Sequence, residues 1–380
     1  MCNRQINLAW IGNLGNVGFN FVKLLNKYYI EASVYIPKDS FRKKTPGNPN
    51  YEYEGASKEK FVNHYNRYLV LNYLLRKVNL EISIAKDLSS IFKKHNIIQA
   101  QTGNEIIANE ISRINNTPFV ALPTGADLSE LAFSKTRDGS KYRNALRNAK
   151  HIFLVNINQF GYIDKLQLND IPHSFLPFNI NASNFQFSEN IIKNKLIIFS
   201  IARLDWKSKS RKSTKRNDIF FRGFAEFVNN ENKKDFELVI ADWGVDRKET
   251  YRLIKILGIG HITKFISPGN KKYFYEIIKS SNIIVDQFNL GAIGLGALES
   301  MAMSKPVFAY CDEGDSKVAY GNVIPVINTR NEEDVFRYLK LLSENYIKKK
   351  SEESFNWVQK HHSEEKIFLT LKEVYQKILL

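Results

Sequence analysis

Short, almost entirely apolar segments recur along this chain and alternate with stretches whose apolar residues recur every three or four positions. The first kind is typical of strands buried on both faces, and the second of amphipathic helices. In the first half, the predicted strands are 6–13, 31–37, 97–101, 118–125, 151–156 and 174–180. From residue 195 the pattern starts again, with predicted strands 195–204, 236–244, 262–269, 282–288 and 306–310. The alternation predicts the α/β class, with two parallel sheets that are covered by helices on both faces.

The length of 380 residues exceeds what one hydrophobic core usually holds. We therefore expect two Rossmann-like domains that face a cleft, an N-terminal domain over residues 1–188 and a C-terminal domain over 189–362. Two helices are predicted within 59–94. Ligands of such sheets bind beyond the carboxyl ends of the strands, so residues that follow a strand are the candidates for function.

Composition excludes several classes of protein. Cys2 and Cys311 are too few for a disulfide framework or a cysteine-rich metal site. No run approaches the roughly 18 apolar residues of a membrane span, and the N-terminus lacks a signal-peptide core, so we expect a cytoplasmic protein. We expect no metal, because the histidines show no zinc-site spacing. The net charge of +16 favours anionic partners, namely nucleotides, phospholipid surfaces or nucleic acid.

Two clusters in the first half follow predicted strands. "GNLGNVG" places Gly12, Gly15 and Asn16 at a strand-to-helix turn, where the backbone can approach an anion. Its spacing is not that of a dinucleotide site, and a tight turn without a ligand is the alternative. "LPTGADLSEL" places Thr124 and Asp127 at another such junction. Asp127 is either a helix cap or a contact to the substrate.

The most cationic stretch, "ARLDWKSKSRKSTKRND" (202–218), follows the first strand of the second half. Arg203 and Lys215 are at its two ends, where an arginine after a strand and a lysine before a helix can clamp a diphosphate. We therefore predict that these two residues bind a diphosphate. The alternative for the middle lysines is a solvated loop. Nucleic acid is not favoured, because the stretch lacks the interleaved aromatic residues of single-strand binding.

A second loop, "NLGAIGLGALESMAMSKPVFAY" (289–310), contains Gly291, Gly294 and Gly296 before a helical pattern. Its backbone amides and the helix N-terminus can hold phosphate. Glu299 in the following helix would repel phosphate, but it can accept hydrogen bonds from the two hydroxyls of a ribose. The alternative is a helical glutamate that faces solvent.

Taken together, these clusters resemble the retaining glycosyltransferases of family 4, which have the GT-B fold. "GLGALESMAMSKPVFAY", with Gly294, Leu295 and Glu299, resembles the family's G-L-x-x-x-E-A-M-A-x-G-x-P-V segment. Arg203 matches the family's arginine and "KRND" its Lys-Gly, so that Lys215 is the candidate diphosphate lysine. The resemblance thus implies that Arg203 and Lys215 are catalytic. Because "DWKSKSRKST" is then an insertion, Lys209 and Arg216 remain alternatives. The C-terminal helix, 363–380, resembles the segment that returns to the N-terminal domain.

The chain departs from this family at one position. The family's E-x7-E pair would require its first glutamate at residue 291, which is Gly291 here. In the family that glutamate touches the donor sugar, so Asp286 and Gln287 are the predicted replacements. The resemblance also assigns Ile266 to the donor site. A variant branch of the family is one explanation of the departure, and loss of activity is the other.

The resemblance implies transfer of a hexosyl-type sugar from a nucleotide-sugar donor, UDP-sugar rather than GDP-sugar, with retention of configuration and without metal. The alternatives are a nucleotide-sugar epimerase of the same fold and a catalytically weak binding protein. In the first half, "SKYRNALRNAK" (140–150) would place Arg143, Arg147 and Lys150 on one helix face, and "FRKK" (41–44) adds charge. We therefore expect a peripheral protein at the inner face of an anionic membrane, with a glycan or lipid-linked glycan acceptor. Charge that serves solubility alone is the alternative.

Overall fold

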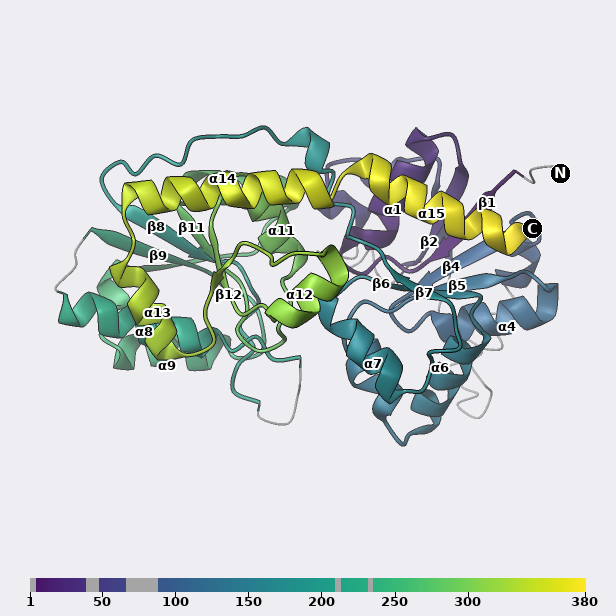
Figure 1. The fold of residues 1–380 in the computed structure, drawn as a ribbon, viewed down its shortest axis with the longest axis horizontal. Helices are drawn as coiled ribbons and strands as arrows, with labels where there is room; N and C mark the ends of the chain where they lie inside the picture. Colours follow the sequence, from purple (N-terminus) through teal and green to yellow (C-terminus); the bar gives the residue numbers. More distant parts are fainter. Residues whose placement is uncertain (1–4, 39–47, 66–87, 209–212, 232–234) are drawn as a thin grey trace. The chain divides into compact units, whose positions relative to one another are not determined.

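The structure, a computed structural model, describes residues 5–38, 48–65, 88–208, 213–231 and 235–380 (Figure 1). Contacts between residues divide the chain into two compact units. The first unit comprises Met1–Asn179 and Glu364–Leu380, and the second unit comprises Ile180–Ser363. One chain segment therefore leaves the first unit, builds the whole of the second, and returns.

The first unit is built on a seven-stranded sheet in the order β3-β2-β1-β4-β5-β6-β7, and every neighbouring pair is parallel. Its strands are β1 (Asn7–Ile11), β2 (Glu31–Pro37), β3 (Val62–Tyr65), β4 (Ile97–Gln101), β5 (Phe119–Leu122), β6 (His151–Leu154) and β7 (His173–Phe175). Its helices include α1 (Val17–Lys27), α4 (Glu105–Asn115), α5 (Ala126–Ser129), α6 (Arg137–Asn148), α7 (Phe160–Lys165) and α15 (Glu364–Leu379). Helices α1 and α15 lie on one side of this sheet, and α4, α6 and α7 on the other (Figure 1).

The second unit has a six-stranded parallel sheet in the order β10-β9-β8-β11-β12-β13. Its strands are β8 (Leu196–Ser200), β9 (Phe236–Ala241), β10 (Thr263–Ile266), β11 (Ile283–Val285), β12 (Val307–Ala309) and β13 (Ile327–Asn328). Its helices include α8 (Asn217–Asn230), α9 (Arg247–Ile256), α10 (Lys271–Ser280), α11 (Leu295–Ala302), α12 (Glu313–Tyr320), α13 (Glu332–Lys340) and α14 (Glu344–His361). Both sheets have the strand order of Rossmann folds, and they confirm the predicted α/β class.

The strands are short and apolar because both of their faces are covered. All residues of β4, β5, β11 and β12 are buried. Helix starts follow local rules: the side chains of Thr136, Asn270, Asp312 and Ser343 each accept a hydrogen bond from a backbone N–H in the first turn of α6, α10, α12 and α14. These caps fix where the helices begin, and hence the length of the loops that follow the strands.

Helix α15 packs on the rest of the first unit through ring stacking, a buried hydrogen bond and an ion pair. The ring of Phe368 stacks on that of Tyr28 with 4.3 Å between centroids. The buried hydroxyl of Tyr375 donates to Gln99 Oε1 at 3.0 Å. Lys27 Nζ pairs with Glu364 Oε2 at 2.5 Å. The last helix is therefore part of the core of a unit whose other residues precede position 180.

The structure corrects the predicted elements in three places. Residues 62–65, within the 59–94 segment predicted to be helical, form strand β3, whereas 66–87 lie outside the described residues. Strand β13 was not predicted, because two residues carry no readable periodicity. Helix α6 ends at Asn148, so Lys150 is not on the predicted basic helix face.

Candidate functional site

Two loops meet at the carboxyl edge of the second sheet. The basic loop (residues 203–216) follows β8, and the glycine loop (residues 286–296) follows β11. Strands β8 and β11 are neighbours in the sheet, although β9 and β10 separate them along the chain. The strand order reverses between them, which is where open α/β sheets bind their ligands.

The two ends of the basic loop are joined by main-chain hydrogen bonds. The N–H groups of Lys215 and Arg216 donate to the carbonyl of Asp205 at 2.5 and 3.3 Å. Arg203 Nε donates to the buried carboxylate of Asp205 at 3.2 Å, and Arg203 Nη2 to the carbonyl of Ser213 at 3.3 Å. This closure keeps Arg203 and Lys215 at the edge of the sheet. Lys209 lies outside the described residues.

Lys215 points to the glycine loop, where its Nζ donates to Gln287 Oε1 at 2.7 Å. Burial lowers the pKa of Lys215; Asp286 and Asp205 raise it, and Arg203 lowers it further. Arg216 is engaged elsewhere, since its guanidinium donates twice to the Asp218 carboxylate at 3.0 and 3.2 Å. The geometry favours Lys215 over Arg216 as the diphosphate cation, and that role stays a prediction.

The glycine loop is held by the two residues that follow β11. Asp286 Oδ2 accepts from the N–H of Gly294 at 2.7 Å, and Gln287 Nε2 donates to the carbonyl of Ala292. Burial raises the pKa of Asp286, while Lys215 and the Gly294 N–H lower it. The N–H of Gly294, predicted to face phosphate, thus already has a carboxylate partner. Both side chains are buried, and their predicted contact with the donor sugar stays untested.

The two loops are also joined by contacts of their own. The N–H of Phe288 donates to the carbonyl of Lys215 at 2.9 Å, and Asn289 Nδ2 donates to Thr214 Oγ1 at 3.0 Å. The glycine loop runs into α11, where Leu295 is the first residue and Gly296 the second. A Cβ on Gly296 would lie 3.1 Å from the side chain of Ile201, so glycine lets α11 pack closely on the end of β8.

Gly291 occupies the position at which the family resemblance expects a glutamate. Its φ of +68° lies in the left-handed region that favours glycine. A Cβ there would be 3.3 Å from the Cβ of Asp312, and the Gly291 carbonyl accepts from the N–H of Asp312 at 2.9 Å. The conformation of this loop, together with Asp312, accounts for the glycine.

Glu299 on α11 does not face solvent, so the solvent-facing alternative is wrong. Its side chain is 8% exposed, and its Oε1 pairs with Lys271 Nζ at 2.6 Å. Lys271, itself 12% exposed, begins α10 and was not predicted as a site residue. Ile266 ends β10, two strands from β8, and its carbonyl accepts from the N–H of Asp242 at 2.8 Å.

In the first unit, the predicted acceptor-side residues form two compact turns. Gly12, Gly15 and Asn16 have φ angles of +99°, +63° and +58° between β1 and α1. The Asn13 side chain joins this turn to the start of α1, with its Oδ1 accepting from Phe19 N at 2.7 Å and its Nδ2 donating to Asn16 Oδ1 at 2.8 Å. The Nδ2 of Asn16 is buried, without a hydrogen-bond partner among the described residues. A ligand contact at this turn stays a prediction.

The Asp127 carboxylate binds the backbone of its own loop, but Asp127 is not the N-cap of α5, which is Gly125. Its carboxylate accepts from the N–H groups of Thr124, Gly125 and Leu128 at 3.1, 2.7 and 3.0 Å. Burial raises its pKa, and the three N–H groups oppose that rise. Glu105, fully buried nearby, has its pKa raised by burial and by the Asp127 carboxylate. The predicted helix cap is therefore wrong, because these contacts come from within the first turn of α5. A direct role of Thr124 or Asp127 toward an acceptor stays a prediction.

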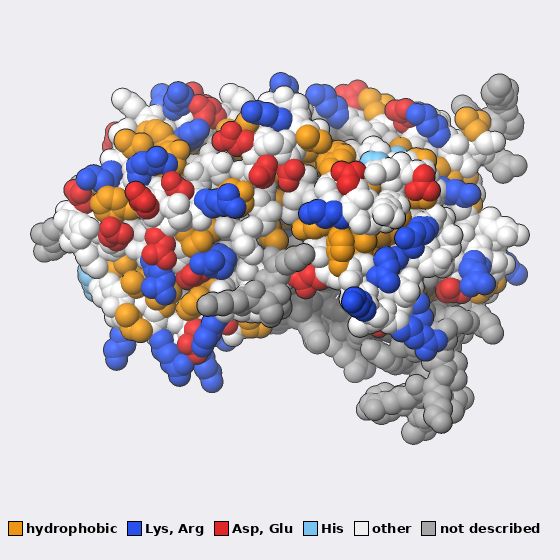
Figure 2. Space-filling model, turned by 60° about the horizontal axis from the view of Figure 1, so that its bottom comes forward, with side chains coloured by type: hydrophobic (Ala, Val, Ile, Leu, Met, Phe, Trp, Pro, Cys, Tyr) orange, Lys and Arg blue, Asp and Glu red, His pale blue; other side chains and the backbone are white. Residues whose placement is uncertain are grey.

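The predicted basic face of α6 is smaller than expected. Arg143 donates to the carbonyls of Ala132 and Ser134, both at 2.8 Å, and so serves the fold. "FRKK" (41–44) lies outside the described residues. Lys and Arg side chains are spread among acidic and hydrophobic ones on the face shown in Figure 2. Among the described helices, none is long and apolar enough to cross a membrane.

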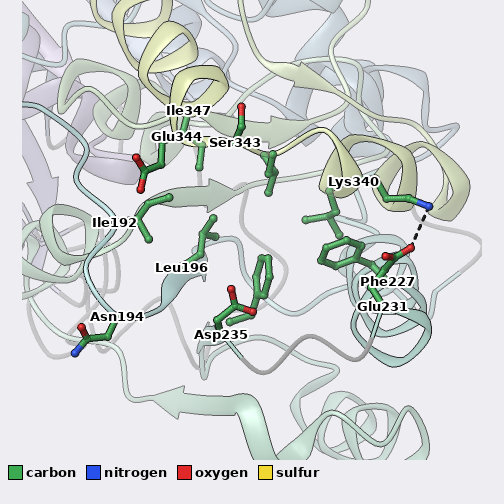
Figure 3. Close-up of a pocket in the computed structure, with 13 residues that line it drawn as sticks. Ile192, Asn194, Leu196, Phe227, Glu231, Asp235, Lys340, Ser343, Glu344 and Ile347 are labelled. Carbon is green, nitrogen blue, oxygen red and sulfur yellow. Dashed lines mark ion pairs between the residues drawn. The ribbon is translucent and has the colours of Figure 1, made fainter.

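The two loops remain the candidate site when possible metal ligands and a separate pocket of the second unit are considered. The described residues bring together no group of three or more His, Cys, Asp or Glu side chains that could hold a metal ion. A pocket of about 350 Å³ (Figure 3) lies at the amino ends of the strands, beside Leu196 and Phe236, the first residues of β8 and β9. It contains none of the predicted site residues and lies at the edge opposite to the two loops.

Residues 181–356 match the family model described as "Glycosyl transferases group 1". The matched range falls within the second unit and contains both loops, Glu299 and Lys271. A search of curated protein sequences finds no match.

Solved structures resemble the whole chain. HepE of Anabaena, solved with UDP-glucose, has a TM-score of 0.74 at 13% identity, over 98% of this chain and 100% of that one. Sucrose-phosphate synthase from Thermosynechococcus elongatus has a TM-score of 0.72 at 13% identity, over 98% and 99%. A putative UDP-N-acetylglucosamine 2-epimerase from Listeria monocytogenes has a TM-score of 0.57 at 12% identity, over 93% and 91%. At such identities the likeness shows the fold, which is GT-B.

Proposed function

We propose that this protein is a glycosyltransferase that moves a hexosyl-type sugar from a nucleotide-sugar donor to an acceptor hydroxyl, with retention of configuration and without a metal ion. The observation that carries the proposal is the arrangement at the reversal point of the second sheet. There the cations Arg203 and Lys215 stand beside a loop whose glycines lie before and at the start of α11, within the part of the chain that matches group 1 glycosyl transferases.

Each part of the donor has a candidate partner. Arg203 and Lys215 would take the diphosphate, because two cations at a partly buried edge stabilise its charge. Glu299 would accept the ribose hydroxyls, and Ile266, at the end of β10, would face the base. UDP is the favoured nucleotide, since HepE and a second GT-B neighbour, MnaA of S. aureus, were solved with UDP.

In the proposed reaction, the acceptor oxygen forms a bond to the anomeric carbon on the face from which the diphosphate leaves. The bond from that carbon to the diphosphate oxygen breaks, and the acceptor proton passes to a leaving phosphate oxygen. The protein then needs no carboxylate base. Its work is to orient the two substrates and to stabilise the charge that develops on the diphosphate.

The acceptor is proposed as a class, a glycan or lipid-linked glycan presented at an anionic membrane surface inside the cell. This part of the proposal rests on the net charge of +16. A nucleotide-sugar epimerase is the second candidate, because epimerase structures share the fold over most of their length. A catalytically weak binding protein is the third, because of Gly291.

Turnover of donors tests the proposal. The purified protein is expected to release UDP slowly from UDP-glucose or another UDP-sugar, because a transferase transfers its sugar slowly to water when no acceptor is present. The release should continue in the presence of EDTA. Product analysis separates the candidates: an epimerase returns a UDP-sugar of altered configuration, and a binding protein returns the donor unchanged. Failure of every UDP-, GDP-, ADP- and CMP-sugar to react would contradict the proposal.

Glu299→Gln is expected to weaken UDP binding by roughly 1–3 kcal/mol, because the ribose loses an ionised acceptor. The measurement is calorimetric binding of UDP and 2′-deoxy-UDP to both proteins. In the variant, removal of the 2′-hydroxyl should cost little further affinity. Lys271→Met is the control for loss of the Lys271–Glu299 pair. An equal deoxy penalty in wild type and Glu299→Gln would show that Glu299 does not hold the ribose.

A further inference from the structure

Gln287 connects the cation of the basic loop to the main chain of the glycine loop. Its side chain is 2% exposed. Its Oε1 accepts from Lys215 Nζ at 2.7 Å, and its Nε2 donates to the carbonyl of Ala292. Lys215 and Gln287 are 72 positions apart in sequence, so this link is made by the fold alone.

The two partners of Gln287 require opposite hydrogen-bonding groups, one an acceptor and the other a donor. The Lys215 ammonium can only donate a hydrogen bond, and the Ala292 carbonyl can only accept one. A side-chain amide satisfies both at once, which also fixes the orientation of its oxygen and nitrogen. A carboxylate would satisfy the lysine but would place an acceptor against the carbonyl. An apolar side chain of similar length would satisfy neither group.

The rest of Lys215 is clamped at the main chain. Its N–H donates to the Asp205 carbonyl at 2.5 Å, and its own carbonyl accepts from the N–H of Phe288 at 2.9 Å. With the backbone fixed on both sides, the contact to Gln287 decides where the ammonium lies. An ammonium has three donors, so one directed at Gln287 leaves two for an anionic ligand.

We propose that Gln287 is a positioning residue that sets the place of the Lys215 ammonium relative to the glycine loop, and that it acts on the leaving diphosphate through Lys215 rather than by touching the donor sugar. This inference rests on the proposed function for its diphosphate, but its geometry is present without any ligand. It gives Gln287 a different role from the sugar contact that the sequence predicted.

In the described part of the chain, four charged or polar groups act on Lys215. Two carboxylates favour the charged form of Lys215: that of Asp286, which directly precedes Gln287 on the glycine loop, and that of Asp205. Arg203 disfavours the charged form. Gln287 completes this set with a neutral acceptor. Changing Gln287 to a carboxylate should therefore raise the pKa of Lys215, and removing its acceptor should lower that pKa, because the ammonium loses a hydrogen bond.

The first test measures that pKa without any ligand. The rate of acylation of Lys215 by acetic anhydride is followed against pH, with the modified peptide quantified by mass spectrometry. Gln287→Glu should shift the titration to higher pH and Gln287→Met to lower pH. Asn282→Met is the matched control, because Asn282 is a buried amide directly before β11, the strand that Gln287 follows, and it accepts from Ile197 N at 2.9 Å. Shifts in one common direction, or none, would overturn the proposal.

The second test is a double-mutant cycle on turnover of the UDP-sugar. Gln287→Met should lower kcat by about tenfold in the wild-type background and have no further effect when Lys215 is already methionine. An equal loss in both backgrounds would mean that Gln287 does not act through Lys215, and would contradict the proposal. If no donor reacts, the proposed function fails, while the acylation experiment still decides the role of Gln287.

Discussion

Replacing Lys215 with alanine is expected to reduce kcat for a UDP-sugar by about 100-fold or more. The reason is that the ammonium would stabilise charge on the departing diphosphate at a partly buried edge of the sheet, where such a contact is strong. The measurement is steady-state UDP release, with circular dichroism to verify the fold.

Arg216→Ala is the matched control, because the next residue along the chain is also cationic but is bonded to Asp218. It should leave kcat within about twofold. If the two variants lose activity equally, the charge of the loop as a whole matters and not the placement of Lys215. If Arg216→Ala alone loses activity, the position of the diphosphate cation was predicted wrongly.

The second large effect is expected for Gly244→Ala, in the turn after β9. Gly244 has a φ of +122°, and an added Cβ would lie 2.3 Å from the carbonyl oxygen of Leu204 and 2.6 Å from its nitrogen. Backbone strain and overpacking together predict a loss of about 3 kcal/mol in the free energy of unfolding. The midpoint of thermal unfolding of the second unit should therefore fall by roughly 6–12 °C.

Gly258→Ala separates the two causes. Gly258 also has a positive φ, +72°, but a Cβ there would meet no atom within 4 Å. Its expected cost is about 1 kcal/mol, from backbone conformation alone. Equal losses in both variants would show that contact with Leu204 adds nothing. Because Leu204 lies between Arg203 and Asp205, we also expect Gly244→Ala to lower turnover more than Gly258→Ala does.

Most strands could be predicted because a strand that is buried on both faces is a continuous apolar run in the sequence. The predicted strands at 31–37 and 97–101 coincide with β2 and β4. Strand β3 was missed since only its last residue, Tyr65, is buried. An edge strand of this kind lacks the continuous apolar run on which the other predictions depended.

The loops that follow the strands were also visible, because glycine and charge after an apolar run are local signals. The partners within the site were not. Glu299 pairs with Lys271 from a different helix, and Gln287 joins Lys215 to Ala292 across two loops. Such contacts depend on which strands are neighbours, and periodicity contains no information about that order. From the sequence alone, Lys271 at the start of α10 could not be distinguished from a lysine that faces solvent.

The return of the chain to the first unit has a consequence for its synthesis. A ribosome makes the strands of the first unit early, but the helix that covers Tyr28 and bonds Gln99 arrives only with residues 364–379, after the entire second unit. Domains made first usually fold first. Here the order of completion is reversed: the second unit, a continuous segment, can finish while the first still exposes apolar surface. Until residues 364–379 have been made, the first unit therefore exposes the apolar surface that α15 covers in the finished protein, and such surface promotes aggregation.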